Sequence, residues 1–198
     1  MKRLFLLSPA NCAGARARMV MRAEASFPLA VRLRTTGAPL GEVFAFMSGL
    51  YFRGKLTYAA AFGDALVITT NRGLVAPDVL VTTADLAEMA GGDIHPEDPS
   101  YRRPLLRDLR RHVSAGARER GVVLLGSVAT GKYVDVLTHA LGERLLFPSQ
   151  FVGRGDMSRG GLMLRCAAAG EELSYQPVLG AVRRGKRPPK LPALSGKR

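Results

Sequence analysis

Residues 126–133, Gly-Ser-Val-Ala-Thr-Gly-Lys-Tyr, form the segment whose residue types and spacing come closest to a chemical site. Two glycines and a lysine between an apolar run and a helical pattern are typical of a loop whose backbone N–H groups and lysine bind phosphates. Hydrolysis in such a loop needs a serine or threonine after the lysine to hold magnesium, but Tyr133 follows Lys132. Three interpretations stay open: nucleotide hydrolysis, a phosphate- or base-binding turn without hydrolysis, and a plain strand-to-helix turn.

A second candidate is the glycine-rich segment 153–161, which contains Arg154 and Arg159. We expect a loop here, because glycines let a backbone approach a ligand closely. Two arginines on such a loop can bind the phosphates of a nucleic-acid backbone. Asp156 lies between them and can instead pair with one of the arginines, which would make the segment structural.

Other patterns of catalytic residues are not evident. His95, His112 and His139 have neither metal-ligand spacing nor a carboxylate pattern beside them. Cys12 and Cys166 are far apart and are expected to be reduced thiols. We therefore expect no metal and no other cofactor, and we assign no catalytic residue.

Charge is the strongest signal in the composition. The 198 residues include 29 lysines and arginines against 16 acidic residues, for a formal net charge of +13. Such a balance favours a polyanionic partner, with nucleic acid first and DNA ahead of RNA. The segment 183–198 carries seven of these cations and no acid: Arg183, Arg184, Lys186, Arg187, Lys190, Lys197 and Arg198.

Periodicity of the apolar residues predicts alternating strands and helices. Strands are expected at 2–8, 65–70, 121–126 and 144–147. Helices are expected at 41–62 with a break at Gly49 or Gly54, and at 101–120, 130–141 and 162–169. A basic helix is expected within 11–22 and a short one near 84–89, whereas 26–40 is expected to be irregular.

This alternation predicts an α/β fold, with a mostly parallel or mixed central sheet flanked by helices. We expect one domain over residues 1–182, followed by a basic, proline-rich and disordered tail over 183–198. Ligands of such sheets bind at the carboxyl ends of the strands. The apolar runs are too short to span a bilayer, so no membrane partner and a cytoplasmic location are expected.

Four segments resemble, in the same order, the YaaA family of peroxide-stress DNA-binding proteins. Residues 6–10, Leu-Leu-Ser-Pro-Ala, are similar to the end of the family's first strand, and 68–78 are similar to its Ser-Gly-Leu-Tyr-Gly-Leu-Leu-Arg-Pro-Leu-Asp stretch. Residues 124–127 with Tyr133 resemble its Asn-Leu-Ala-Ser strand end and the tyrosine after it. Residues 154–159 resemble its Ala-Arg-Gly-x-Met-Ser/Ala-Arg segment. Asn11 stands where the family has a lysine.

The resemblance implies an α/β fold with a positively charged cleft for duplex DNA and a role in stress response or genome maintenance. The same general fold is similar to that of uracil-DNA glycosylases and of a domain of archaeosine synthase, although the glycosylase motifs are absent here. An enzyme acting on a nucleobase or nucleotide, such as a base-modifying transferase or glycosidase, is the alternative. The residues implied for the cleft are Ser8, Asn11, Arg72, Ser127, Lys132, Arg154 and Arg159.

Overall fold

A six-stranded sheet forms the centre of the computed structural model, which describes residues 3–114 and 121–191. Its order is β4-β3-β1-β6-β7-β8, and β1, β3, β6 and β7 run parallel, while β4 and β8 are antiparallel strands at the two edges. The strands are β1 Arg3–Leu7, β3 Gly63–Ile68, β4 Leu74–Val75, β6 Val122–Leu125, β7 Leu145–Pro148 and β8 Tyr175–Pro177. A separate pair joins β2 Ala38–Pro39 to β5 Leu80–Val81.

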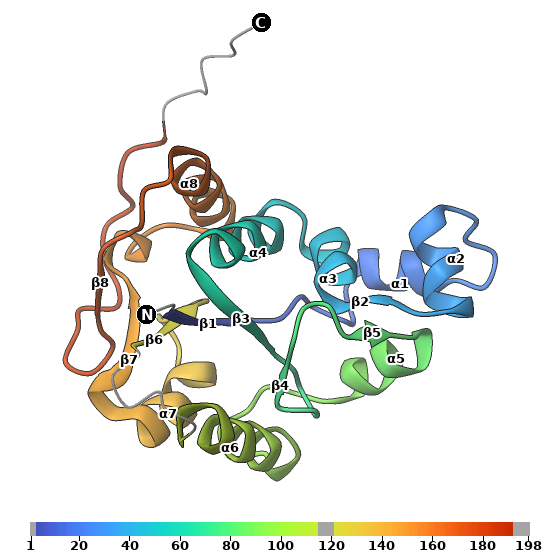
Figure 1. The fold of residues 1–198 in the computed structure, drawn as a ribbon, viewed down its shortest axis with the longest axis horizontal. Coiled ribbons are helices and arrows are strands. Elements are labelled where there is room, and N and C mark those ends of the chain that lie inside the picture. The colour runs from blue at the N-terminus through green and yellow to red at the C-terminus, as the bar shows by residue number, and fades with distance from the viewer. Residues whose placement is uncertain (1–2, 115–120, 192–198) are drawn as a thin grey trace, which may run out of the picture.

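Helices cover both faces of the sheet, with α4 and α8 on one face and α6 and α7 on the other (Figure 1). The helices are α1 Ala15–Met21, α2 Pro28–Thr35, α3 Leu40–Ser48, α4 Leu50–Phe62, α5 Thr83–Gly91, α6 Pro99–Ser114, α7 Gly131–Leu141 and α8 Asp156–Ala169, with 3-10 turns η1 Gly142–Arg144 and η2 Ser149–Phe151. The predicted single α/β domain with a mostly parallel sheet is confirmed. None of the helices within the described ranges is both long and apolar enough to cross a membrane.

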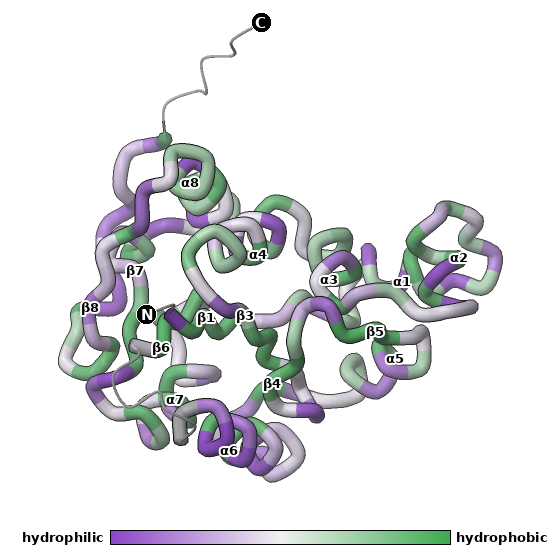
Figure 2. Tube along the Cα trace, viewed as in Figure 1, coloured by the Kyte–Doolittle hydropathy of each residue, from purple (hydrophilic) through white to green (hydrophobic). Residues whose placement is uncertain are grey.

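Alternation along the central strands explains the two layers, because successive side chains of a strand face opposite sides of the sheet. Phe5 and Leu7 of β1 pack into the core shared with α4 and α8, whereas Leu4 and Leu6 pack against α6 and α7. Both faces of the central strands are covered by helices. These strands therefore consist of continuous apolar runs, which are typical of a buried parallel sheet (Figure 2).

The segment 26–40 was expected to be irregular, and this prediction is wrong. Residues 28–35 form α2, in which Pro28 occupies the first helical position, where a missing N–H costs nothing. The chain leaves the helix through Gly37, whose φ of 83° is readily adopted only by glycine. The proline and glycine therefore mark the ends of a helix and not an irregular stretch.

The predicted break within 41–62 is confirmed and occurs at Gly49. Its φ of 60° ends α3 and starts α4, a conformation that glycine adopts without strain. Gly54 instead lies inside α4. The expected helix at 101–120 corresponds to α6, and residues 115–120 lie outside the described part of the chain.

The expected loop at 153–161 is helical from Asp156 onward, because α8 starts there instead of at residue 162. Gly160 and Gly161 are therefore helix residues. The correction matters for the site, because it places Arg159 on a helix that packs against α4.

The first part of the expected tail lies against the folded domain. Arg184 donates two hydrogen bonds, of 3.1 and 3.0 Å, to the carbonyl of Ala129 in the loop between β6 and α7. Gly153 packs against the backbone of Lys186. Residues 183–191 thus follow the loops after β6 and β7, and residues 192–198 lie outside the described residues.

Candidate functional site

A cavity of about 600 Å³ lies at the edge of the sheet where β1 and β3 end. Leu7 is level with Val67 of β3 and with Leu125 of β6, so these three strands end side by side. The chain crosses from β1 to β3 on one side and then to β6 on the other, which makes this edge a topological switch point. Open α/β sheets bind their ligands at such points.

Polar and apolar groups both line the cavity. Phe44, Met89 and Ile94 supply apolar surface, while Asn11, Thr69, Thr70, Asp93 and Lys132 supply polar groups, with Tyr133 and residues 9–13 closing the wall. Lys132 and Tyr133 belong to the first turn of α7, whose N-terminal end carries a partial positive charge. This mixture suits an aromatic ligand that carries an anionic group.

Cys12 also lines this cavity, and its thiol is buried. Burial raises the pKa of the Cys12 thiol to about 11. Because the thiolate is the reactive form, the environment of Cys12 suppresses its reactivity.

Lys55 of α4 is fully buried and reaches Ser8, the residue that precedes Pro9 of the cavity wall. Its Nζ donates to the carbonyl oxygen of Ser8 at 2.5 Å and to the hydroxyl oxygen of Ser8 at 2.9 Å. The rings of Tyr51 and Phe52 lie 4.3 and 4.8 Å from Nζ and form an apolar and π-rich collar. Burial lowers the pKa of Lys55 to about 7, an effect that nearby Asp156 opposes and nearby Arg159 reinforces.

The backbones of α4 and α8 touch, and this contact positions the buried side chains. A Cβ at Gly54 would lie 2.6 Å from the carbonyl oxygen of Gly160, and a Cβ at Gly160 would lie 2.9 Å from the Cα of Tyr51. Only glycine allows such a close crossing. Arg159, next to Gly160, is therefore held against Tyr51 and near Lys55.

Arg159 is 7% exposed and is fixed by the end of η2. Its Nε and Nη2 donate to the carbonyl oxygen of Phe151 at 3.3 and 3.2 Å, and its Nη1 lies 3.7 Å from a carboxylate oxygen of Asp156. The Tyr51 hydroxyl lies beside this guanidinium but has no well-formed hydrogen bond. Burial raises the pKa of Tyr51 to about 12.

The structure brings some of the residues expected at a cleft together and separates others. Ser8, Asn11 and Lys132 gather at the cavity or directly beneath it. Ser127 is half-buried in the loop after β6, and the 126–133 segment as a whole connects β6 to α7. That connection puts Lys132 at the cavity and fits both the phosphate-binding and the plain-turn interpretations.

The arginines expected at the cleft have structural partners. Arg72 pairs with Asp85 at 2.5 Å and with Glu88 at 2.7 Å, which ties the turn after β3 to α5. Arg154 donates to the Gln150 carbonyl at 3.0 Å and to the Ser158 hydroxyl at 3.2 Å. Arg159, as described above, is buried between α8 and η2.

Sequence reasoning missed Lys55 and Tyr51. A signal was present, because Tyr51, Phe52, Lys55, Tyr58 and Ala59 recur at helical spacing and share one face of α4. A lysine on the apolar face of a helix is expected to be buried.

Comparisons with protein-family models, with curated proteins and with solved structures find no match for this chain. Within the described ranges, no three His, Cys, Asp or Glu side chains gather closely enough to hold a metal ion. The functional argument therefore starts from the geometry of the cavity and of the buried groups beneath it.

Proposed function

We propose that this protein binds nucleic acid, DNA in preference, along the edge at which β1, β3 and β6 end. One observation carries the proposal: the cavity and the basic C-terminal segment meet at one loop. Arg184 holds the carbonyl of Ala129, and three residues further along the chain Lys132 lines the cavity. The preference for DNA rests on the resemblance to the YaaA family.

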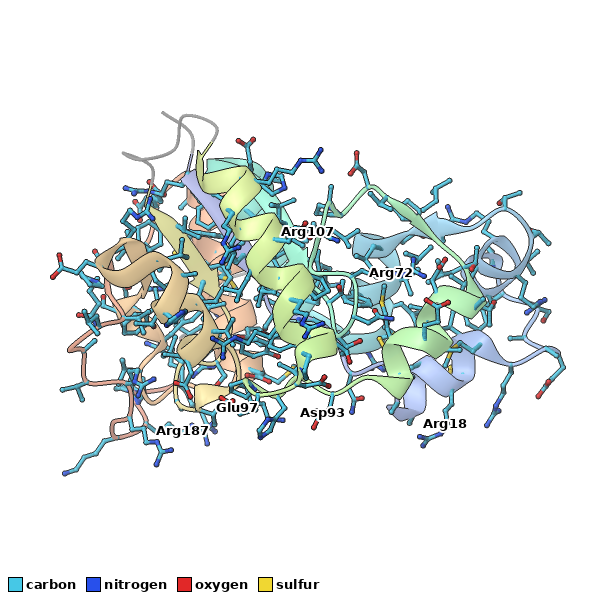
Figure 3. The ribbon with its side chains drawn as sticks, turned by 90° about the horizontal axis from the view of Figure 1, so that it is seen from below. Arg18, Arg72, Asp93, Glu97, Arg107 and Arg187 are labelled. Carbon is cyan, nitrogen blue, oxygen red and sulfur yellow. The ribbon has the colours of Figure 1, made fainter. Side chains whose placement is uncertain are left out.

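Cations and carboxylates are unevenly distributed along this edge, and their positions suggest how a nucleic-acid strand is bound. Figure 3 shows Arg187 and Arg18 toward opposite ends of the edge, with Glu97 and Asp93 between them. Cations neutralise backbone phosphates, and carboxylates repel them. We infer that the backbone follows the basic ends, while the central cavity receives a base or a single nucleotide.

The size of the cavity agrees with this division. Its volume of about 600 Å³ falls within the range of small-ligand sites. Ile94 and Tyr133 are partly exposed and can contact a base, and the exposed Lys132 can contact a phosphate. The excess of cations over the whole chain supplies the general attraction that brings a polyanion to this edge.

The test is binding of labelled duplex DNA, single-stranded DNA and structured RNA over a salt series. We expect affinity to fall linearly in a log–log plot, with a slope of several units, in full-length protein. Lys132→Ala should reduce the slope by about one unit. Arg144→Ala is the matched control, because Arg144 precedes β7 at the opposite edge of the sheet. Equal effects of the two variants, or a slope near zero, would contradict the proposal.

A second candidate function is an enzyme that acts on a nucleobase or nucleotide. It is favoured by the contact between Lys55 and Ser8, because a buried lysine with a lowered pKa is a frequent feature of catalytic sites. Incubation with free nucleotides and nucleosides, followed by chromatography, tests it. A product that forms with native protein and not with Lys55→Met would establish the activity, and no turnover of any of them would count against it.

A further inference from the structure

Two buried cations lie near each other without a buried carboxylate to balance them. Lys55 of α4 and Arg159 of α8 are 0% and 7% exposed, and the glycine crossing of these helices brings them together. Asp156, the nearby carboxylate, is 67% exposed on its side chain and 3.7 Å from Arg159. The one buried carboxylate within the described ranges is Asp108, which lies on α6 across the sheet and binds Arg107.

Two buried positive charges are costly unless an anion balances them. Buried charges are normally paired with an opposite charge, because removal from water is otherwise uncompensated. Lys55 instead donates to two neutral oxygens of Ser8, although an ammonium group has three protons to give. Arg159 uses Nε and Nη2 on one carbonyl, and its Nη1 lies 3.7 Å from the exposed carboxylate of Asp156.

The Tyr51 hydroxyl adds a third donor. It is buried without a well-formed hydrogen bond, lies beside Arg159, and is one helical turn from Lys55. A buried polar group without a partner is costly and calls for an explanation. Lys55, Arg159 and Tyr51 therefore present N–H and O–H groups in one buried region, where the hydrogen-bond acceptors described for Lys55 and Arg159 are neutral oxygens.

This region adjoins the cavity at two points. Ser8, which holds Lys55, directly precedes Pro9 of the cavity wall. Tyr133 lines the cavity and lies within electrostatic range of both Tyr51 and Asp156.

We propose that Lys55, Arg159 and Tyr51 form the binding centre for a terminal phosphate group, carried by a free nucleotide or by the end of a nucleic-acid strand. Three neighbouring donors in one buried region suit the oxygens of a phosphate. The buried position excludes an internal phosphodiester, because its chain would have to continue on both sides. The identity of the ligand rests on the proposed function, whereas the anion centre itself rests on the buried donors.

The experiment measures binding of inorganic phosphate and of dAMP by calorimetry, together with thermal stability with and without phosphate. Lys55→Met should weaken phosphate binding by about 30-fold or more, the effect of removing one partner of a buried charge pair. At pH 6, where Lys55 is charged, the same variant should melt at a higher temperature than native protein when no anion is present, because an unbalanced charge is gone. Tyr51→Phe removes a single oxygen atom and should weaken phosphate binding without lowering stability.

Arg53→Gln is the matched control. Arg53 lies on α4 two residues from Lys55 but is exposed, so its loss of charge should leave phosphate binding unchanged. Phosphate that stabilises native protein and Lys55→Met equally would overturn the anion centre. So would a Lys55→Met protein that melts at a lower temperature than native protein at pH 6 without phosphate.

A comparison of 5′-phosphorylated and unphosphorylated oligonucleotides separates this inference from the proposed function. Tighter binding of the phosphorylated strand, lost in Lys55→Met, supports both. Equal, salt-dependent binding of the two strands retains nucleic-acid binding and overturns the terminal-phosphate site. Phosphate and dAMP binding that depends on Lys55, without any binding of strands, retains the anion centre for a free nucleotide and overturns the proposed function.

Discussion

The Nζ atom of Lys55 lies 2.9 Å from the hydroxyl oxygen of Ser8 and 2.5 Å from its carbonyl oxygen. This contact ties the middle of α4 to the carboxyl end of β1, at the edge of the sheet where the cavity opens. Both residues are buried, so the contact is shielded from water. A lysine in such a place makes stability depend on pH.

Stability should rise with pH between about 7 and about 10.5 because of Lys55. Burial lowers the pKa of Lys55 from 10.5 to about 7 in the folded protein. Within this window the unfolded chain binds a proton that the folded chain lacks, so the free energy of unfolding increases with pH. Asp156 and Arg159 face the ammonium and act in opposite directions, while Tyr51, with a pKa of about 12, stays protonated.

Urea unfolding of native protein and Lys55→Met over pH 6–10 checks this prediction. The difference between their free energies of unfolding should change by a few kcal/mol across the window, at about 1.4 kcal/mol per pKa unit. As pH rises, the free energy of unfolding of the native protein should increase relative to that of Lys55→Met. Parallel curves would show that Lys55 keeps an ordinary pKa.

Ser8→Ala should destabilise the protein through Lys55. The substitution removes the hydroxyl that accepts from Nζ and leaves a buried donor without its partner, at a cost of about 1–3 kcal/mol. In a Lys55→Met background the same change should cost much less, because the donor is absent. A double-mutant cycle by urea unfolding measures this coupling, and additive effects would contradict it.

The crossing of α4 and α8 should not tolerate side chains. Gly54→Ala and Gly160→Ala place a Cβ 2.6 Å and 2.7 Å from backbone oxygens of the facing helix, so the helices must separate. We expect each to lower the free energy of unfolding by about 1–3 kcal/mol or more. Gly91→Ala is the control, because nothing lies within 4 Å of its Cβ position, and it should be neutral or slightly stabilising. Thermal unfolding compares the three variants.

The sequence was sufficient to predict the four parallel strands and every described helix except α2, because continuous apolar runs and helical periodicity come directly from burial. The short edge strands β4 and β8 and the pair β2–β5 were not predicted. Val122 to Leu125 is such a run and forms the central strand β6. Apolar periodicity does not show whether a proline or glycine lies within an irregular segment or at the end of a helix. Pro28 and Gly37 were interpreted as marks of an irregular segment, although they bound a helix.

The candidate site could be predicted only in part. The position of the cavity follows from topology, and Asn11 and Lys132 lie there as expected. The roles of the arginines could not be predicted, because a charge pattern does not show which partner a side chain finds. Arg72 finds Asp85 and Glu88, which are distant enough in the sequence that no local spacing indicates the pairing.

Cys12 should react more slowly with iodoacetamide than Cys166. Burial raises the pKa of Cys12 to about 11, and the Cys166 thiol is less buried although its pKa is raised as well. Mass spectrometry after labelling at pH 8 gives the two rates, with Cys166→Ser to isolate Cys12. Faster labelling of Cys12 would instead support an oxidant-sensing thiol beside the cavity.

Removal of the C-terminal segment should weaken nucleic-acid binding, and the decrease in the salt slope measures how many phosphate contacts are lost. A chain that ends at Val182 lacks seven cations, so the salt slope on duplex DNA can fall by about six units at most. The fall should be smaller than this limit if some of the seven cations do not reach a phosphate of the duplex. A residual slope of several units would place the rest of the contacts on the folded domain.

Arg184→Gln in the full chain then separates charge from positioning. The substitution removes one cation and also the two hydrogen bonds that hold the basic segment beside the cavity. Arg187→Gln removes one exposed cation and neither of these bonds, so it should lower the slope by about one unit on duplex DNA. A larger loss of affinity for Arg184→Gln than for Arg187→Gln, measured on the same duplex, would show that the position of the segment matters as well as its charge. Equal losses would show that it acts through charge alone.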